Sequence, residues 1–341
     1  MNKYTLIILL FSLIMAACNN PKSIQNQSIQ PKSDSTETIN PYNPTPKMEA
    51  LKARNGDSIS KMHFLVFGDS KGSVYFKQVL RRADSLKPEF CITTADLVKV
   101  GGGEKGKINY DKLDKDGGWF MKKYPMWPTV GNHETYGGNT AFHNFTNFFG
   151  IKHDFYSFEY GNAKFIALPW PKIKDDSVRL KMFEEELKSA NGKLIFVFKH
   201  RPHYDVGSKK YTDVEGTETA VTKLYDKYHV TAVFSGHDHI YYRTKRNNTT
   251  YIISAGAGAP IYALKREKDA AKGDAYYGKR IKSDIQSGMS PYKFVASDGT
   301  TTDLNEAMYY VLSVKVDGRK VSIEMIDSKT GKVWDKAVIA E

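Results

Sequence analysis

The chain has 341 residues, 40% of them hydrophobic, and a formal net charge of +12 at pH 7. This length and apolar content suit one large α/β domain with a substantial core rather than two separate domains. The two cysteines, Cys18 and Cys91, exclude a framework of internal disulfides. The positive charge suits anionic substrates such as phosphate esters, but the lysines are scattered along the chain, so no nucleic acid is expected as a partner.

The first residues have the pattern of an export signal. Lys3 precedes an apolar run at residues 4–15, which is too short to span a bilayer, and Ala16-Ala17-Cys18 follows. This pattern resembles the processing site of bacterial lipoproteins, in which the Cys becomes the lipid-bearing first residue of the mature chain. We therefore expect a signal peptide over residues 1–17 and a membrane anchor at Cys18, with ordinary cleavage after Ala17 as the alternative. The resemblance, together with Asn19 in place of Asp, favours the bacterial outer membrane, on either its periplasmic or its surface face.

Residues 18–58 are rich in Asn, Pro, Ser, Thr and Gln and carry little aliphatic or aromatic clustering. Such a composition cannot bury enough apolar surface to offset chain entropy, so it predicts a flexible tether. Residues 59–341 are expected to form the catalytic domain.

Apolar patterns in this domain predict strands and helices in alternation. Strands are expected at 62–67, 90–94, 126–130, 193–198, 230–234 and 250–255, with helices at 74–87, 110–123, 178–190 and 217–228. Residues 155–168 read as one hairpin, and 308–316 with 320–327 as a closing hairpin. Between these, residues 262–305 are polar and basic without a clear period, which predicts an insertion that is either a lid over a site or a disordered loop.

Polar motifs follow most of the predicted strands. The five motifs are Gly68-Asp69-Ser70-Lys71, Ala95-Asp96-Leu97, Gly131-Asn132-His133-Glu134, His200-Arg201-Pro202 and Gly236-His237-Asp238-His239. The carboxyl ends of strands in open α/β sheets are where active sites form, so these side chains are expected to meet at one edge. Carboxylate, amide and imidazole ligands in this mixture suit divalent ions and predict a metal hydrolase with an activated water.

The ordered set of motifs resembles the calcineurin-like metallophosphoesterases, and most closely their purple acid phosphatase-like branch. The resemblance covers residues 62–259, and its most specific parts are residues 200–204 and 236–243. It implies a four-layer αββα sandwich.

The resemblance also implies roles for single residues. Asp69 and His239 would bind a first metal, Asn132, His200 and His237 a second, and Asp96 would bridge the two. His133 would contact the phosphoryl group and assist the leaving oxygen, with Glu134 orienting it. The two ions would be divalent, with Mn, Mg, Zn or Fe as candidates.

The chain departs from the family pattern at two positions. Lys71 stands where many members have a metal-binding His, and Lys99 stands where the purple branch has an iron-binding Tyr. We therefore predict a colourless protein whose first site is weaker and holds Mg, Mn or Zn in preference to ferric iron. Lys71, Lys99 and His203 are candidate substrate contacts, and Lys71 is expected to point at substrate phosphate or solvent because an ammonium beside two cations is disfavoured.

These features predict an exported, lipid-anchored phosphoesterase in which a metal-bridging hydroxide attacks phosphate esters. The favoured activity is that of a phosphomonoesterase resembling acid phosphatases. A phosphodiesterase or nucleotide hydrolase on the same metal core is the alternative. A third reading is a non-catalytic lipoprotein that binds a phosphate ligand, with Lys71 and Lys99 in place of a lost cation. The presence of His133 argues against this reading, because a binding protein needs no leaving-group imidazole.

Overall fold

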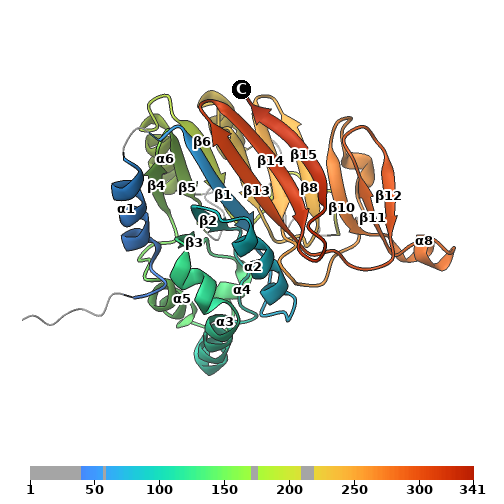
Figure 1. The fold of residues 1–341 in the computed structure, drawn as a ribbon, viewed down its shortest axis with the longest axis horizontal. Coiled ribbons are helices and arrows are strands. Elements are labelled where there is room, and N and C mark those ends of the chain that lie inside the picture. Colours follow the sequence, from blue (N-terminus) through green and yellow to red (C-terminus); the bar gives the residue numbers. More distant parts are fainter. Residues whose placement is uncertain (1–39, 57–58, 170–175, 209–218) are drawn as a thin grey trace, which may run out of the picture. The chain divides into compact units, whose positions relative to one another are not determined.

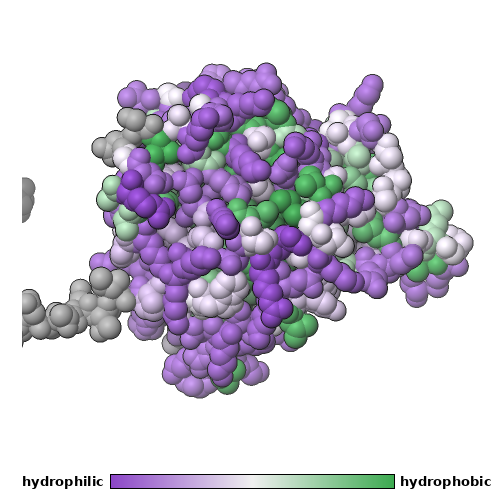
Figure 2. All heavy atoms as spheres, viewed as in Figure 1, coloured by the Kyte–Doolittle hydropathy of each residue, from purple (hydrophilic) through white to green (hydrophobic). Residues whose placement is uncertain are grey.

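The computed structural model describes residues 40–56, 59–169, 176–208 and 219–341. The predicted signal peptide and Cys18 lie outside these residues. Within them, no helix is both long enough and apolar enough to cross a bilayer. The face of the molecule seen in Figure 2 is mostly hydrophilic.

Two β-sheets pack face to face (Figure 1). The six-stranded sheet has the order β15-β14-β13-β1-β2-β3, with β1 (Lys61–Phe67), β2 (Phe90–Thr93), β3 (Met126–Trp127), β13 (Tyr310–Asp317), β14 (Lys320–Asp327) and β15 (Val333–Ala340). The nine-stranded sheet has the order β12-β11-β10-β8-β9-β7-β6-β5-β4. Its strands are β4 (Tyr156–Tyr160), β5 (Ala163–Ala167), β6 (Leu194–Phe198), β7 (Ala232–Ser235), β8 (Tyr241–Arg246), β9 (Thr249–Ser254), β10 (Ala275–Lys279), β11 (Tyr292–Val295) and β12 (Thr301–Leu304).

Helices cover the outer faces of both sheets, so the expected four-layer α/β arrangement is confirmed. The helices are α1 (Pro44–Asn55), α2 (Phe76–Ser85), α3 (Gly103–Lys123), α4 (Asn132–Thr135), α5 (Ala141–Phe149), α6 (Ser177–Lys188), α7 (Ala220–Lys227) and α8 (Lys282–Gln286), with a short 3-10 helix η2 (Glu267–Asp269). Helices α2 and α3 pack on the six-stranded sheet, and α6 and α7 pack on the other.

The core between the sheets is built around Phe64 of β1. Its ring lies 5.1 Å from Phe165 and 5.3 Å from Phe196, both on the opposite sheet. Strand β6 shows why its sequence is apolar throughout: Phe196 faces this inner core, whereas Val197 packs under α6 and α7. A strand that is buried on both faces has no polar alternation, because both sets of side chains leave water.

Helix α1 corrects one expectation from the sequence. Residues 44–55 were predicted as part of a flexible tether, but they form a helix in which Met48 and Leu51 are buried in the main core. Asn43 caps the helix by accepting from the amide of Thr45. The sequence of this segment gives only a weak helix signal, because its large apolar residues, Met48 and Leu51, lie on one side of a single helical turn. They are buried by residues from the rest of the domain.

The expectation of a disordered loop at residues 262–305 is wrong, because this segment carries the strands β10, β11 and β12. Strands β10, β11 and β12 pair antiparallel in succession and extend the nine-stranded sheet beyond β8 (Figure 1). Strand β12 is exposed, as expected for the polar edge of a sheet. The sequence lacked a strand signal at β12 because an edge strand needs no buried face.

Candidate metal centre

The predicted polar motifs meet at one edge where the carboxyl ends of parallel strands from both sheets converge. Asp69 follows β1, Asp96 follows β2, and Asn132 begins α4 after β3. From the second sheet, His200 follows β6, while His237 and His239 lie in the loop between β7 and β8. All six side chains are buried, although they come from positions up to 170 residues apart in the printed sequence.

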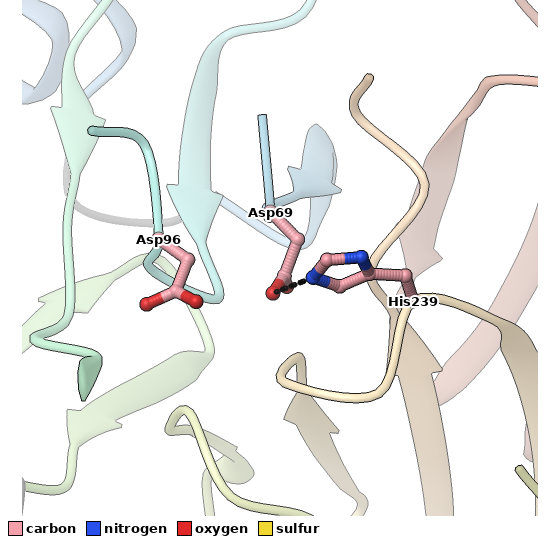
Figure 3. Close-up of side chains that lie close together, drawn as sticks. All are labelled: Asp69, Asp96 and His239. Atoms are coloured by element: carbon pink, nitrogen blue, oxygen red, sulfur yellow. Dashed lines mark ion pairs between the residues drawn. The ribbon is translucent and has the colours of Figure 1, made fainter. Parts of the chain in front are cut away.

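The first group at this edge consists of Asp69, Asp96 and His239. Each offers one ligand atom, and the three atoms lie within 4.8 Å of one another (Figure 3). Nε2 of His239 is 3.4 Å from a carboxylate oxygen of Asp69, and its Nδ1 donates to the carbonyl of Pro260 at 2.8 Å. That hydrogen bond places the proton on Nδ1, so Nε2 faces the carboxylates with its lone pair.

The second group consists of Asn132, His200 and His237. The amide oxygen of Asn132 lies 3.0 Å from His200 Nε2 and 3.0 Å from His237 Nδ1, and the two ring nitrogens are 3.2 Å apart. Nδ1 of His200 donates to the carbonyl of Thr94 at 2.7 Å, which leaves Nε2 as the ligand atom. Three ligand atoms at these separations can converge on one ion.

Asp96 lies between the two groups. One of its carboxylate oxygens is 3.3 Å from His200 Nε2, on the side of the second group. The other oxygen is buried and lies 3.4 Å from Nζ of Lys71. Although burial alone would raise the pKa of Asp96, the nearby His200 and Lys71 hold this pKa well below its ordinary value. Asp96 is therefore a buried carboxylate with one oxygen for each group.

The donor set fits divalent cations. Oxygen atoms from carboxylates and an amide, together with neutral imidazole nitrogens, are the ligands that Mg, Mn and Zn share. Nε2 of His239 is buried without a hydrogen-bond partner among the described residues. A buried polar atom without a partner is costly, and a bound ion removes that cost.

Backbone strain is concentrated in these loops. Asp69, Asp96 and His237 have φ angles of 59°, 52° and 73°, in the left-handed region that side chains other than glycine rarely adopt. Each such residue costs about 1 to 2 kcal/mol. The conformations are held by backbone contacts, including the amide of His237, which donates to a carboxylate oxygen of Asp69 at 3.1 Å. These backbone conformations direct the side chains of Asp69, Asp96 and His237 towards the same small space.

Two glycines allow the carboxylates to approach the backbone. A Cβ on Gly131 would lie 2.3 Å from an oxygen of Asp96, and a Cβ on Gly236 would lie 2.3 Å from an oxygen of Asp69. Neither position has room for a larger residue without moving a carboxylate. The carboxylates of Asp96 and Asp69 therefore pack directly against the backbone of Gly131 and Gly236.

His133 stands beside Asp96, with Nε2 3.8 Å from the second oxygen of that carboxylate. Its Nδ1 lies 2.7 Å from the carbonyl oxygen of Lys99. Burial lowers the pKa of His133, and the charge of Asp96 offsets only part of this effect. His133 thus presents Nε2 to the site and is neutral over a wider pH range than a free imidazole.

The expectation that Glu134 orients His133 is wrong. The Glu134 carboxylate accepts from the backbone amides of Asp96 at 2.9 Å, Leu97 at 2.8 Å and Gly131 at 2.9 Å. Burial and the nearby charge of Asp96 raise the pKa of Glu134 to about 7. Glu134 therefore ties the second and third motif loops together, whereas a backbone carbonyl orients His133.

The three candidate substrate contacts behave differently. Lys71 points at the centre, with Nζ 3.4 Å from an oxygen of Asp96, and does not point into solvent. Burial lowers the pKa of Lys71, but the carboxylates of Asp96 and Asp69 raise it by more, so the net shift of this pKa is upward. Lys99 is exposed and contributes its carbonyl. His203 is buried against the ring of Tyr225, with centroids 5.4 Å apart, and its contact with substrate stays a prediction.

Tyr262 is a site residue that sequence reasoning missed. Its ring stacks on His239 with centroids 3.9 Å apart and planes 20° apart, and its amide donates to the His239 carbonyl at 2.9 Å. The available signal was the run of small residues at 254–259, which follows β9, a strand parallel to β7. That run is one more loop at the same edge, and Tyr262 lies just beyond it.

A model of the calcineurin-like phosphoesterase family matches residues 62–241, which is more than half of the chain. The chain belongs to the calcineurin-like phosphoesterase family. It is therefore a phosphoric ester hydrolase, and the family and the buried donor set together assign metal-dependent hydrolysis to this centre. No curated protein sequence matches the chain.

Several solved structures share the fold. A purple acid phosphatase, PPD1, from seeds of yellow lupin (Lupinus luteus) superposes with a TM-score of 0.60 at 16% identity, covering 82% of this chain and 54% of that one. The chain thus spans about half of the lupin protein. GAP50, the anchor in the inner membrane complex of Plasmodium, superposes with a TM-score of 0.55 at 14% identity, covering 83% and 89%. A dimetal phosphatase from Danio rerio gives 0.52 at 9% identity, covering 82% and 98%. At these identities the likeness is one of fold.

Proposed function

We propose that this phosphoesterase is a phosphomonoesterase whose metal ions are held around Asp96. The observation that carries the proposal is the pair of cationic or potentially cationic groups at this carboxylate, with Lys71 Nζ at 3.4 Å and His133 Nε2 at 3.8 Å. A phosphomonoester carries up to two negative charges, whereas a diester carries one. A centre that adds a lysine ammonium to its metal ions therefore favours the more highly charged monoester.

The ligand roles follow from the two groups of side chains. Asp69, Asp96 and His239 would hold one divalent ion, and Asp96, Asn132, His200 and His237 the other. When bound, such ions polarise phosphoryl oxygens and lower the pKa of a coordinated water. The absence of a tyrosine at position 99, where Lys99 stands, supports a colourless centre with Mg, Mn or Zn.

His133 would act on the leaving group. Its Nδ1 proton is engaged by the carbonyl of Lys99, so the second proton that the ring takes up on becoming an imidazolium would lie on Nε2, which faces Asp96. From that position the imidazolium can donate to the leaving oxygen of the ester as a general acid. Because burial lowers the pKa of His133, this donation is favoured at acidic pH.

The activity is tested by a panel of p-nitrophenyl phosphate, bis-p-nitrophenyl phosphate and nucleotides, with Mn²⁺ added to the purified chain. We expect the monoester to be hydrolysed at least about tenfold faster than the diester. The variant His133→Ala should lose about 10²- to 10⁴-fold in rate and keep its bound metal. Preference for the diester or for nucleotides would overturn the monoester assignment, and binding of phosphate without turnover would support a non-catalytic lipoprotein.

We also propose that the chain is exported and lipid-anchored at Cys18, in a bacterial outer membrane. The support is the sequence itself, in which a short apolar run ends at Ala16-Ala17-Cys18 and Asn19 follows. Anchoring by acyl chains on one residue needs no membrane-spanning helix. Replacement of Cys18 by Ser should release the protein from the membrane fraction of expressing bacteria, and retention of the variant in that fraction would contradict the anchor.

A further inference from the structure

The two halves of the metal centre are not equivalent in ligands. The second group offers four ligand atoms to one ion, from Asp96, Asn132, His200 and His237. The first group offers three, from Asp69, Asp96 and His239, and in the described residues no other His, Cys, Asp or Glu side chain completes this group. The second position should therefore hold its ion more tightly.

The ammonium of Lys71 lies beside Asp96, one of the three ligands of the first position. Nζ of Lys71 lies 3.4 Å from the Asp96 oxygen that points away from the second group. The Lys71 side chain is 15% exposed, and the Asp96 side chain is fully buried, so the pair is largely shielded from water. Tyr262, stacked on His239, lies on the same side and interacts electrostatically with Lys71.

The backbone aims Lys71 into this position. Its φ angle is 47°, in the left-handed region, and its amide donates to the carbonyl of Asp96 at 2.9 Å. A lysine that only covered the surface would need neither the strained backbone nor the enclosed ammonium. The same contact ties the first motif loop to the second, so the ammonium is held where Asp96 needs a counter-charge.

We propose that the Lys71 ammonium occupies the first cation position, so that the resting protein retains one divalent ion per chain, at the second position. The inference rests on the proposed function, because it concerns the same centre: the second position holds the metal ion and the first position holds the ammonium of Lys71. A divalent ion that enters the first position meets the positive charge of Lys71 in an enclosed site, where repulsion between like charges is strong. Loading of the first position therefore requires displacement of the lysine.

The test counts metal ions in the metal-stripped full chain after Mn²⁺ is added. Titration calorimetry and elemental analysis after desalting give the number of ions per chain for the native protein, Lys71→Met and Lys99→Met. We expect one tightly bound ion in the native protein and two in Lys71→Met, with the second ion binding about 100-fold more tightly than in the native protein, where lysine repulsion opposes it. Lys99→Met, which removes an exposed lysine of the neighbouring loop, should retain one.

Each other result has a distinct meaning. Two tightly bound ions in the native protein, or one in Lys71→Met, would overturn the inference and leave the proposed phosphoesterase intact. No bound ion in any of the proteins would overturn the metal centre and the proposed function together. Thermal unfolding in the absence of metal shows whether Lys71→Met is folded. Lys71→Ala is a second variant without the ammonium, and it must bind the same number of ions as Lys71→Met.

Discussion

The carbonyl oxygen of Lys99 lies 2.7 Å from Nδ1 of His133. The contact orients the imidazole of His133, our proposed leaving-group acid, through the backbone, so the identity of the side chain at position 99 matters little for this orientation. The carboxylate of Glu134 holds the loops on which both residues stand. The candidate metal ligands and His133 are thus positioned by one network that is mostly backbone.

Glu134 is predicted to stabilise the centre by satisfying three backbone amides. Glu134→Gln retains one carbonyl oxygen but places an NH₂ group against donors, so buried amides lose their acceptor. We expect a loss of about 1 to 3 kcal/mol in the free energy of unfolding and weaker binding of Mn²⁺. Urea unfolding and metal titration measure both quantities. Glu104→Gln is the control, because Glu104 is exposed on α3, and equal stability of the two variants would contradict this role.

Gly236 is predicted to be required for the position of Asp69. A methyl group at Gly236 would lie 2.3 Å from the Asp69 carboxylate, so Gly236→Ala should displace that ligand and lower the affinity for the first ion at least about tenfold. Gly299→Ala is the matched control, since Gly299 has a φ of 87° and no atom within 4 Å of the added Cβ. The control should lose stability by backbone strain and keep native metal binding. If both variants bind Mn²⁺ equally, the close approach has no functional meaning.

Tyr262 is predicted to fix the plane of His239. Removal of the stacked ring in Tyr262→Ala should lower activity and metal affinity about 2- to 10-fold, in line with the 0.5 to 1.5 kcal/mol expected of an aromatic pair. Tyr262→Phe keeps the ring and should bind metal like the native protein. A native metal affinity in Tyr262→Ala would show that the backbone bond to His239 alone positions the ligand.

His63 makes stability depend on pH at a position remote from the metal ligands. Burial lowers the pKa of His63 to about 4, and Lys315 adds to this effect. Between pH 6.5 and 4 the unfolded chain binds a proton that the folded chain excludes, so stability is lost as the pH falls through this range. Because the ring is partly exposed, we expect a contribution of about 1 to 2 kcal/mol.

The measurement compares urea unfolding of the metal-stripped native chain and His63→Gln at pH 7.5 and pH 4.5. The glutamine can keep the hydrogen bond to Ser313, which lies 2.9 Å from Nε2 of His63. The variant should lose less stability on acidification than the native chain. Equal losses would show that other groups account for the pH dependence.

Helix α1 is predicted to be part of the folded domain. Met48→Ala should cost about 2 to 4 kcal/mol, because Met48 is 1% exposed and packs in the main core. Thermal unfolding of Met48→Ala and of the exposed control Glu49→Ala separates packing from helix propensity. Equal unfolding temperatures would restore the interpretation of residues 44–55 as a tether.

The metal edge was predictable from the sequence because its strands are buried on both faces. The strands β1, β2, β6 and β7 each end in a run of buried residues, and a polar motif follows that run. The gathering of Asp69, Asp96 and the other motif residues follows from that order. The roles of Glu134 and Lys71 did not follow, because both depend on loop backbone conformations that no residue pattern specifies.

Other elements were missed for a different reason. Helix α1 and strand β12 have little apolar pattern of their own, and each is defined by what it packs on or pairs with. The position of Tyr262 depends on β9 running parallel to β7, a pairing between strands that local sequence does not encode. Local patterns therefore predict the elements that carry the centre better than the elements that surround it.

The most direct test of the central claim is the rate of p-nitrophenyl phosphate hydrolysis by the metal-stripped chain before and after Mn²⁺ is restored. The account predicts almost no turnover before, full turnover after, and no recovery in Asp96→Asn, whose side chain fills the same space with one fewer charge. Turnover that survives stripping, or that returns in Asp96→Asn to the native level, would contradict a metal centre built around this carboxylate.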